Sequence, residues 1–216
     1  MRPKTNVYID GFNLYNGLRR RAKQMGLDAP EHRWLNLSKL AVFLLPDSEI
    51  QVVHYFTARV KRRTEDPDVS VRQQVFFRAL RTLGTNLEIH EGYFQRNKPW
   101  RRLVDNPAEA VRVIDYKEKG SDVALATQLL VDAYEGNCER ACVISNDSDL
   151  VRPIAVAAAK FSSGVIVFNP QPGPAARKLK AVATEYRPMR RRTFRACVFP
   201  DELEDANGVF HKPDSW

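Results

Sequence analysis

The chain enters its first predicted strand with Asn6-Val7-Tyr8-Ile9 and leaves it through Asp10-Gly11-Phe12-Asn13. A short apolar run that stops at an aspartate and a glycine is typical of a buried strand ending in a turn. The pattern recurs at Ala141-Cys142-Val143-Ile144, which runs into Ser145-Asn146-Asp147-Ser148-Asp149. Buried strands that alternate with helices build a parallel sheet covered on both faces. We therefore expect an α/β domain with a central, mostly parallel sheet.

The remaining periodicity supports this fold class. Strand-like runs occur at about 5–9, 50–57, 86–94, 140–145 and 164–168. Helical patterns occur at about 12–25, 36–45, 69–83, 121–135 and 149–161. This alternation predicts a doubly wound domain over residues 1–170. A basic segment near 95–118 predicts an irregular or hairpin-like insertion, and 171–216 predicts a partly irregular C-terminal extension.

The charge balance favours a polyanionic partner. The 216 residues include 34 Lys and Arg against 26 Asp and Glu, a formal net charge of +8. Such a balance favours nucleic acid, and RNA is the partner we expect. No stretch has the apolar length of a membrane span, and the N-terminus lacks the apolar core of a secretory signal. We expect no membrane partner and a cytoplasmic location, and a homo-oligomer is compatible with the sequence.

Acidic residues stand where parallel strands end. Asp10 follows the first predicted strand, Asp147 and Asp149 follow the fourth, and Asp122 lies in the first turn of a predicted helix. Ligands of open parallel sheets bind at this edge, so the four carboxylates are expected to share a cleft. Clustered carboxylates repel one another unless a cation neutralises them, and oxygen ligands suit Mg²⁺ or Mn²⁺. Asp132 lies about 15 Å further along the same helix and is excluded from this site.

Each aspartate also has a simpler interpretation. Asp147 and Asp149 match the N-cap and first turn of a helix, and Asp10 matches a turn residue. The convergence of three chain segments on one edge favours the metal site. Asn13 is expected to position a carboxylate or the scissile phosphate there, or to be an ordinary residue of a first helical turn.

Cysteines and histidines give no comparable pattern. The cysteines lack paired spacing, and a free cysteine within a strand is usually buried. The histidines lack the spacing of metal ligands, so we interpret them as surface or satisfied core residues. The residues concerned are Cys138, Cys142, Cys197, His32, His54, His90 and His211.

Three motifs resemble those of the NYN domains, members of the PIN-like superfamily of metal-dependent ribonucleases. They are Tyr8-Ile9-Asp10-Gly11-Phe12-Asn13-Leu14, Lys119-Gly120-Ser121-Asp122-Val123-Ala124-Leu125 and Ser145-Asn146-Asp147-Ser148-Asp149-Leu150. Their order matches the family, and the resemblance covers about residues 5–170. It implies a three-layer α/β/α domain, a Mg²⁺ or Mn²⁺ site and cleavage of RNA. It places Asp10, Asn13, Asp122, Asp147 and Asp149 in the catalytic site, with the four aspartates as metal ligands.

Two positions depart from the family pattern. Asn146 stands where the family commonly has glycine, and Gln128 stands where a further aspartate often follows the second motif. Asparagine can adopt the left-handed conformation that a glycine would supply, so the turn is compatible with Asn146. Gln128 carries no charge, which favours a single metal ion or a weak enzyme.

Basic residues cluster after the second and third predicted strands. They are Arg59, Lys61, Arg62, Arg63, Arg96, Lys98, Arg101 and Arg102. At this edge they suit a phosphate backbone, Lys119 is placed to touch a phosphate, and Trp100 is placed to stack on a base. The simpler interpretation is a set of solvated loops with Trp100 in the core.

We therefore expect a divalent-metal-dependent nuclease that hydrolyses RNA phosphodiester bonds. A catalytically weak or inactive RNA-binding regulatory protein is an alternative, supported by Gln128 and Asn146. A small-molecule enzyme on the same fold is a further alternative, because a fold does not fix a function.

Overall fold

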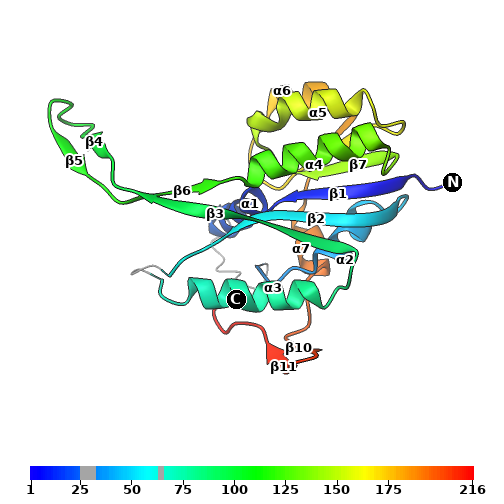
Figure 1. Cartoon of the computed structure of the whole chain (residues 1–216), viewed down its shortest axis with the longest axis horizontal. Coiled ribbons are helices and arrows are strands. Elements are labelled where there is room, and N and C mark those ends of the chain that lie inside the picture. The colour runs from blue at the N-terminus through cyan, green and yellow to red at the C-terminus, as the bar shows by residue number, and fades with distance from the viewer. Residues whose placement is uncertain (25–32, 63–65) are drawn as a thin grey trace.

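The computed structural model describes residues 1–24, 33–62 and 66–216 and places one large sheet between two helical layers (Figure 1). The strands of this sheet are β1 (Lys4–Asp10), β2 (Glu49–Arg59), β3 (Leu87–Asn97), β6 (Asp115–Lys119), β7 (Arg140–Ile144), β8 (Val165–Asn169) and β9 (Glu185–Pro188). The helices are α1 (Gly11–Gln24), α2 (Leu37–Leu44), α3 (Val69–Arg81), α4 (Ser121–Glu135), α5 (Val151–Ala158), α6 (Arg177–Val182) and α7 (Arg191–Ala196). The expected mixed α/β class is confirmed.

The strand order is β6-β3-β2-β1-β7-β8-β9, and only the β3–β6 pairing is antiparallel. The chain builds outward from β1 through β2 and β3, then returns to the other side of β1 at β7. The carboxyl ends of β1 and β7 therefore flank a topological switch point, the place where open α/β sheets bind ligands. The first and third motifs end at this point.

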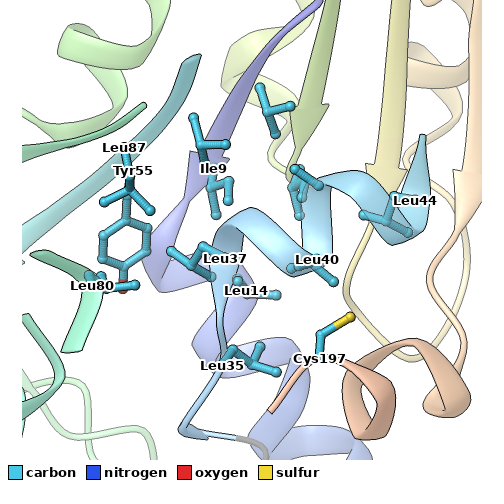
Figure 2. Packing of buried hydrophobic residues seen from close by; sticks show 14 of the residues in the cluster. Ile9, Leu14, Leu35, Leu37, Leu40, Leu44, Tyr55, Leu80, Leu87 and Cys197 are labelled. Atoms are coloured by element: carbon cyan, nitrogen blue, oxygen red, sulfur yellow. The ribbon is translucent and has the colours of Figure 1, made fainter. Parts of the chain in front are cut away.

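The core has two parts, one on each face of the sheet. Ile9 packs with the cluster that contains Leu37 and Leu40 of α2, whereas Tyr8 packs with the cluster that contains Leu125 and Leu129 of α4. Figure 2 shows Leu37 near Ile9 and Tyr55, with Leu40 farther along α2. Because side chains alternate between the faces of a strand, Asp10 shares the α4 face with Tyr8.

The basic insertion is a two-stranded arm. The strand β3 pairs with β6, and beyond them β4 (Trp100–Arg102) pairs with β5 (Ala110–Arg112), both antiparallel. Figure 1 shows this arm extending well away from the helical layers. The arm displays its basic side chains to solvent.

The segment 171–216 contributes to the same core. It supplies α6, β9, α7 and a hairpin of β10 (Glu202–Asp205) and β11 (Gly208–His211). β9 extends the large sheet beside β8, and Phe194 and Phe199 are buried in the core with Trp34. The indole Nε1 of Trp34 also donates to the Pro200 carbonyl at 2.8 Å.

Candidate metal centre at the sheet switch point

Asp10 is a buried carboxylate at the end of β1, with 5% of its surface exposed. The backbone N–H of Asn13 donates to Oδ1 at 2.9 Å, and the Ser145 hydroxyl donates to Oδ2 at 2.8 Å. Burial, together with the charges of Asp122 and Asp147, raises the pKa of Asp10 to about 6 despite these bonds. The site therefore holds more negative charge than its own donors neutralise.

Gly11 makes the turn after Asp10 sterically possible. A Cβ at this position would lie 2.7 Å from the Phe56 carbonyl oxygen and 2.8 Å from the Tyr55 ring. Only glycine fits this approach without a shift of the neighbouring strand. The glycine of the first motif therefore fixes where α1 begins and where Asp10 points.

Asp122 reaches the site from the start of α4. The helix begins after Gly120, whose φ of +98° favours glycine, and the Ser121 N–H donates to Glu118 Oε1 at 3.0 Å. Burial raises the pKa of Asp122, and the charges of Asp147, Glu118 and Asp149 raise it further. The structure thus brings all three motifs together electrostatically. Glu118 was missed from the sequence, although it lies four residues before Asp122.

Asp147 also serves as a helix cap, as its simpler interpretation proposed. Its Oδ1 accepts from the Asp149 N–H at 2.9 Å at the start of the 3₁₀ helix η2 (Ser148–Leu150), and its own N–H donates to Ser145 Oγ at 3.0 Å. Capping engages one oxygen and leaves the Asp147 charge acting on Asp10 and Asp122. Cap and candidate ligand are compatible roles here. Asp149 is exposed at the rim.

Asn13 ties the loops of the site together. Its Oδ1 accepts from the Asn146 N–H and from Gln171 Nε2, both at 3.1 Å. Gln171 Nε2 also donates to the Asn13 carbonyl oxygen at 2.6 Å. These contacts join the segments that follow β1, β7 and β8, so Asn13 acts on the site by positioning its backbone.

The two departures from the family pattern have different structural outcomes. No described non-glycine residue has a positive φ, so Asn146 does not use the left-handed conformation. Its Oδ1 instead accepts from the Tyr186 hydroxyl at 2.6 Å and the Ala176 N–H at 3.1 Å. Gln128 Nε2 donates to Asp132 Oδ1 at 3.0 Å and so serves another carboxylate.

The spacing of the carboxylates limits how an ion is held. Within the described parts of the chain, no three of them bring oxygen atoms within 4.8 Å of one another. Mg²⁺ commonly takes one or two protein carboxylates and keeps several waters, and Mn²⁺ accepts the same oxygen donors. In this arrangement at most two of Asp10, Asp122, Asp147 and Asp149 can bind one such ion directly, which corrects the expectation of four carboxylate ligands. Waters would complete the shell and link the remaining carboxylates to the ion.

The basic residues fall into two groups. Arg59 is paired with Glu91, and Arg101 with Asp115, so part of their charge is already compensated. Trp100 is 68% exposed at the base of the β4–β5 hairpin, which contradicts its placement in the core. Exposed positions also hold Lys61, Arg62, Arg96, Lys98, Arg102 and Lys119. The expectation for Arg63 lies outside the described residues.

A second concave region lies on the opposite face of the sheet. A cavity of about 400 Å³ opens between α1 and α3. Its lining combines aromatic rings with guanidinium groups, and includes Phe12, Tyr55, Phe76, Arg19, Arg33 and Arg72. This is the size and composition of a small-molecule pocket.

The chain belongs to the NYN domain family, whose match extends over residues 4–190. Its membership confirms the resemblance of the three motifs. Among the described residues, no helix combines the length and hydropathy that crossing a membrane requires.

Two known proteins are similar to the chain. 6-Hydroxy-3-succinoylpyridine 3-monooxygenase HspA of Pseudomonas putida is 29% identical over 196 residues. The match covers 79% of this chain and 60% of that protein, so the chain spans less than two thirds of this curated relative. The crystal structure of a Vibrio parahaemolyticus protein of unknown function shares the fold at 15% identity, with a TM-score of 0.54, covering 92% of this chain and 97% of that one.

Proposed function

We propose that the protein is a divalent-metal-dependent nuclease that hydrolyses RNA phosphodiester bonds at the switch-point carboxylates. The observation that carries the proposal is Asp10, a buried carboxylate whose pKa is raised to about 6 and which faces the charges of Asp122 and Asp147. A titratable group perturbed in this way in a ligand-binding position is a candidate functional residue. Membership of a nuclease-like family supports the same reaction class.

Different side chains would have different roles in such a reaction. Two of Asp10, Asp122, Asp147 and Asp149 would bind Mg²⁺ or Mn²⁺ directly, and the others would contact it through its waters. The ion would supply Lewis-acid polarisation of the phosphodiester and a more acidic water. Ser145 donates to the Asp10 carboxylate and accepts from the Asp147 backbone N–H, so one hydroxyl links the Asp10 side chain to the loop that carries Asp147.

The arm and the loop after β2 would bind the substrate. Lys98, Arg102 and Lys119 are exposed on the arm and suit contacts to phosphates, which are independent of base sequence. The exposed ring of Trp100 suits stacking on an unpaired base. A single-stranded or partly unpaired RNA fits this combination best.

RNA cleavage tests the proposal directly. Labelled RNA is incubated with the protein and Mn²⁺ or Mg²⁺, and Asp10→Asn and Asp147→Asn are compared with Asp47→Asn. Asp47 is an exposed aspartate at the opposite end of the strands, just before β2, and its variant is the matched control. Metal-dependent cleavage that falls more than about 100-fold in the first two variants alone supports the proposal. Cleavage that survives both variants contradicts it.

A regulatory RNA-binding role is the alternative that Gln128 favours. Its amide serves Asp132 and adds no charge to the metal centre. RNA binding without cleavage in the same assay would establish this alternative.

A small-molecule enzyme is a second candidate, favoured by the similarity to a monooxygenase and by the cavity between α1 and α3. The guanidinium of Arg33 lies over the Tyr15 ring at the cavity wall, a suitable contact for an aromatic acid. Saturable binding of 6-hydroxy-3-succinoylpyridine that weakens in Arg33→Ala would favour this function. Absence of binding would count against it.

A further inference from the structure

Two histidines and a glutamate meet on the α4 face of the sheet, far from the switch point. His54 lies on β2, and its cross-strand partner Glu88 and the nearby His90 lie on β3. His54 Nδ1 is 3.1 Å from His90 Nε2 and 3.2 Å from Glu88 Oε2, and the last two atoms are 3.6 Å apart. Within the described parts of the chain, this is the group of metal-ligand atoms that lies within 4.8 Å.

The triangle has the dimensions of a metal site. Three atoms at these separations lie on a circle of about 1.9 Å radius. An ion slightly off their plane would lie about 2.0–2.1 Å from each atom, the length of zinc bonds to histidine nitrogen and carboxylate oxygen. Two histidines and one glutamate also leave a coordination position open.

A buried aspartate orients the innermost histidine. Nε2 of His54 is buried without a hydrogen-bond partner among the described residues, and it faces Asp132 Oδ2 at 3.6 Å. The same carboxylate accepts from the Tyr8 hydroxyl at 2.5 Å, Asn6 Nδ2 at 3.0 Å and Asn137 Nδ2 at 2.9 Å. A carboxylate behind a histidine is the usual support of a metal ligand, because it keeps the proton on the far nitrogen.

The polar atoms of the group do not satisfy one another fully. With its proton on Nε2, His54 turns the lone pair of Nδ1 toward His90 Nε2, which can donate to it at 3.1 Å, and toward Glu88, which is itself an acceptor at 3.2 Å. With its proton on Nδ1, it turns the lone pair of Nε2 toward Asp132. A cation inside the triangle removes the conflict. A hydrogen bond from His90 Nε2 to His54 Nδ1 would also satisfy this nitrogen, and the two explanations differ in their response to metal.

The group is accessible from solvent and separate from the acidic centre. The side chain of Glu88 is 52% exposed, that of His90 28% and that of His54 4%, so access decreases inward. β6 covers the outer edge of β3 only at Tyr93–Asn97, beyond Glu88 and His90. Asp132 and Asp122 are ten residues apart on α4, which separates the two sites by about 15 Å.

The geometry points to a site at which His54 Nδ1, His90 Nε2 and Glu88 bind one Zn²⁺ ion, with Asp132 positioning His54. Imidazole nitrogen with one carboxylate is the donor set that suits zinc better than Mg²⁺. The site is independent of the proposed nuclease centre.

Zinc content tests this site. Protein freed of metal is loaded with Zn²⁺, desalted and measured for bound zinc, and its affinity is measured by calorimetry. One equivalent is expected for the wild type, with affinity at least about tenfold lower in Glu88→Gln and His90→Ala and about 10–100-fold lower in Asp132→Asn. His211→Ala, an exposed histidine near Glu202, is the matched control. Circular dichroism of each variant separates lost ligands from lost folding.

Substitution with Co²⁺ identifies the donors. Visible absorption bands that disappear in His90→Ala and show no thiolate charge transfer would assign the ion to this site rather than to Cys138 or Cys142. Retention of the metal that is unchanged in Asp10→Asn would show that the ion is not bound at the acidic centre. Absence of stoichiometric zinc in the wild type, or zinc retention that is unchanged in Glu88→Gln and His90→Ala, would overturn the inference.

Discussion

Helix α4 carries an aspartate near each end, and the two have opposite surroundings. At the start, burial and the charges of Asp147, Glu118 and Asp149 raise the pKa of Asp122. About three turns later, burial alone would raise the pKa of Asp132, but the neighbouring His54 and hydrogen bonds from Asn137, Tyr8 and Asn6 place that pKa well below its usual range.

Asp122 is a carboxylate whose negative charge no nearby cation among the described residues neutralises, whereas Asp132 is a carboxylate whose charge is already stabilised by hydrogen-bond donors. The first kind occurs where a cation is expected, because the fold alone does not neutralise it. The second kind holds neighbouring side chains in place, and here it holds His54. One helix therefore connects a candidate oxygen-ligated centre with a candidate histidine-ligated centre.

The largest effect on stability is expected at Asp132, near the C-terminal end of α4. Asp132→Asn removes the charge that several buried donors share, so the free energy of unfolding should fall by about 2–4 kcal/mol. Because the pKa of Asp132 is lowered on folding, its contribution is present above about pH 4 and is lost as the pH falls further. Urea unfolding at pH 7 measures the change. Unaltered stability would contradict the structural role of this carboxylate.

The opposite sign is expected at Asp10, the carboxylate at the end of β1 whose pKa the charge of Asp122 helps to raise. The pKa of Asp10 rises from 3.8 to about 6 on folding, so its stabilising contribution is present below about pH 4 and is lost as the pH rises through about 6. Asp10→Asn should therefore stabilise the metal-free protein by about 1–3 kcal/mol at pH 7. The gain should shrink toward pH 4 in urea unfolding. A destabilised variant at pH 7 would show that Asp10 is held by its hydrogen bonds.

The arm provides a smaller and different test. Lys98→Ala and Arg102→Ala should each weaken RNA binding a few-fold and reduce its salt dependence by about one unit of slope. Cleavage of bound RNA should be unchanged, because both residues lie outside the carboxylate site. Salt-dependent filter binding measures the effect, and an unaltered slope would remove the arm from the RNA-binding surface.

The sequence predicted the parts of the site that depend on chain direction. Asp10, Asp122 and Asp147 follow from strand ends and a helix start, because parallel strands present these positions at one edge. Ser145 and Glu118 were missed because their roles depend on side-chain hydrogen bonds across elements.

The histidine group was hidden for a related reason. His54 and Glu88 become neighbours only through the register of β2 on β3, which packing sets and local spacing does not reveal. β9 was also missed, since the short, charged run Glu185–Pro188 is a strand only through its pairing with β8. Contacts of this kind can be identified only from the three-dimensional structure.

The central claim is that the excess negative charge around Asp10 marks a metal centre. Thermal unfolding of the wild type and the Asp10→Asn variant, with and without Mn²⁺ at pH 7, tests it most directly. Both proteins also carry Glu88→Gln and are freed of zinc, so that metal binding at the histidine group does not contribute to the measured stability. Mn²⁺ at about 100 times its dissociation constant should stabilise the protein that retains Asp10 by about 2.7 kcal/mol and the Asp10→Asn variant far less. Equal stabilisation of the two proteins would contradict the account.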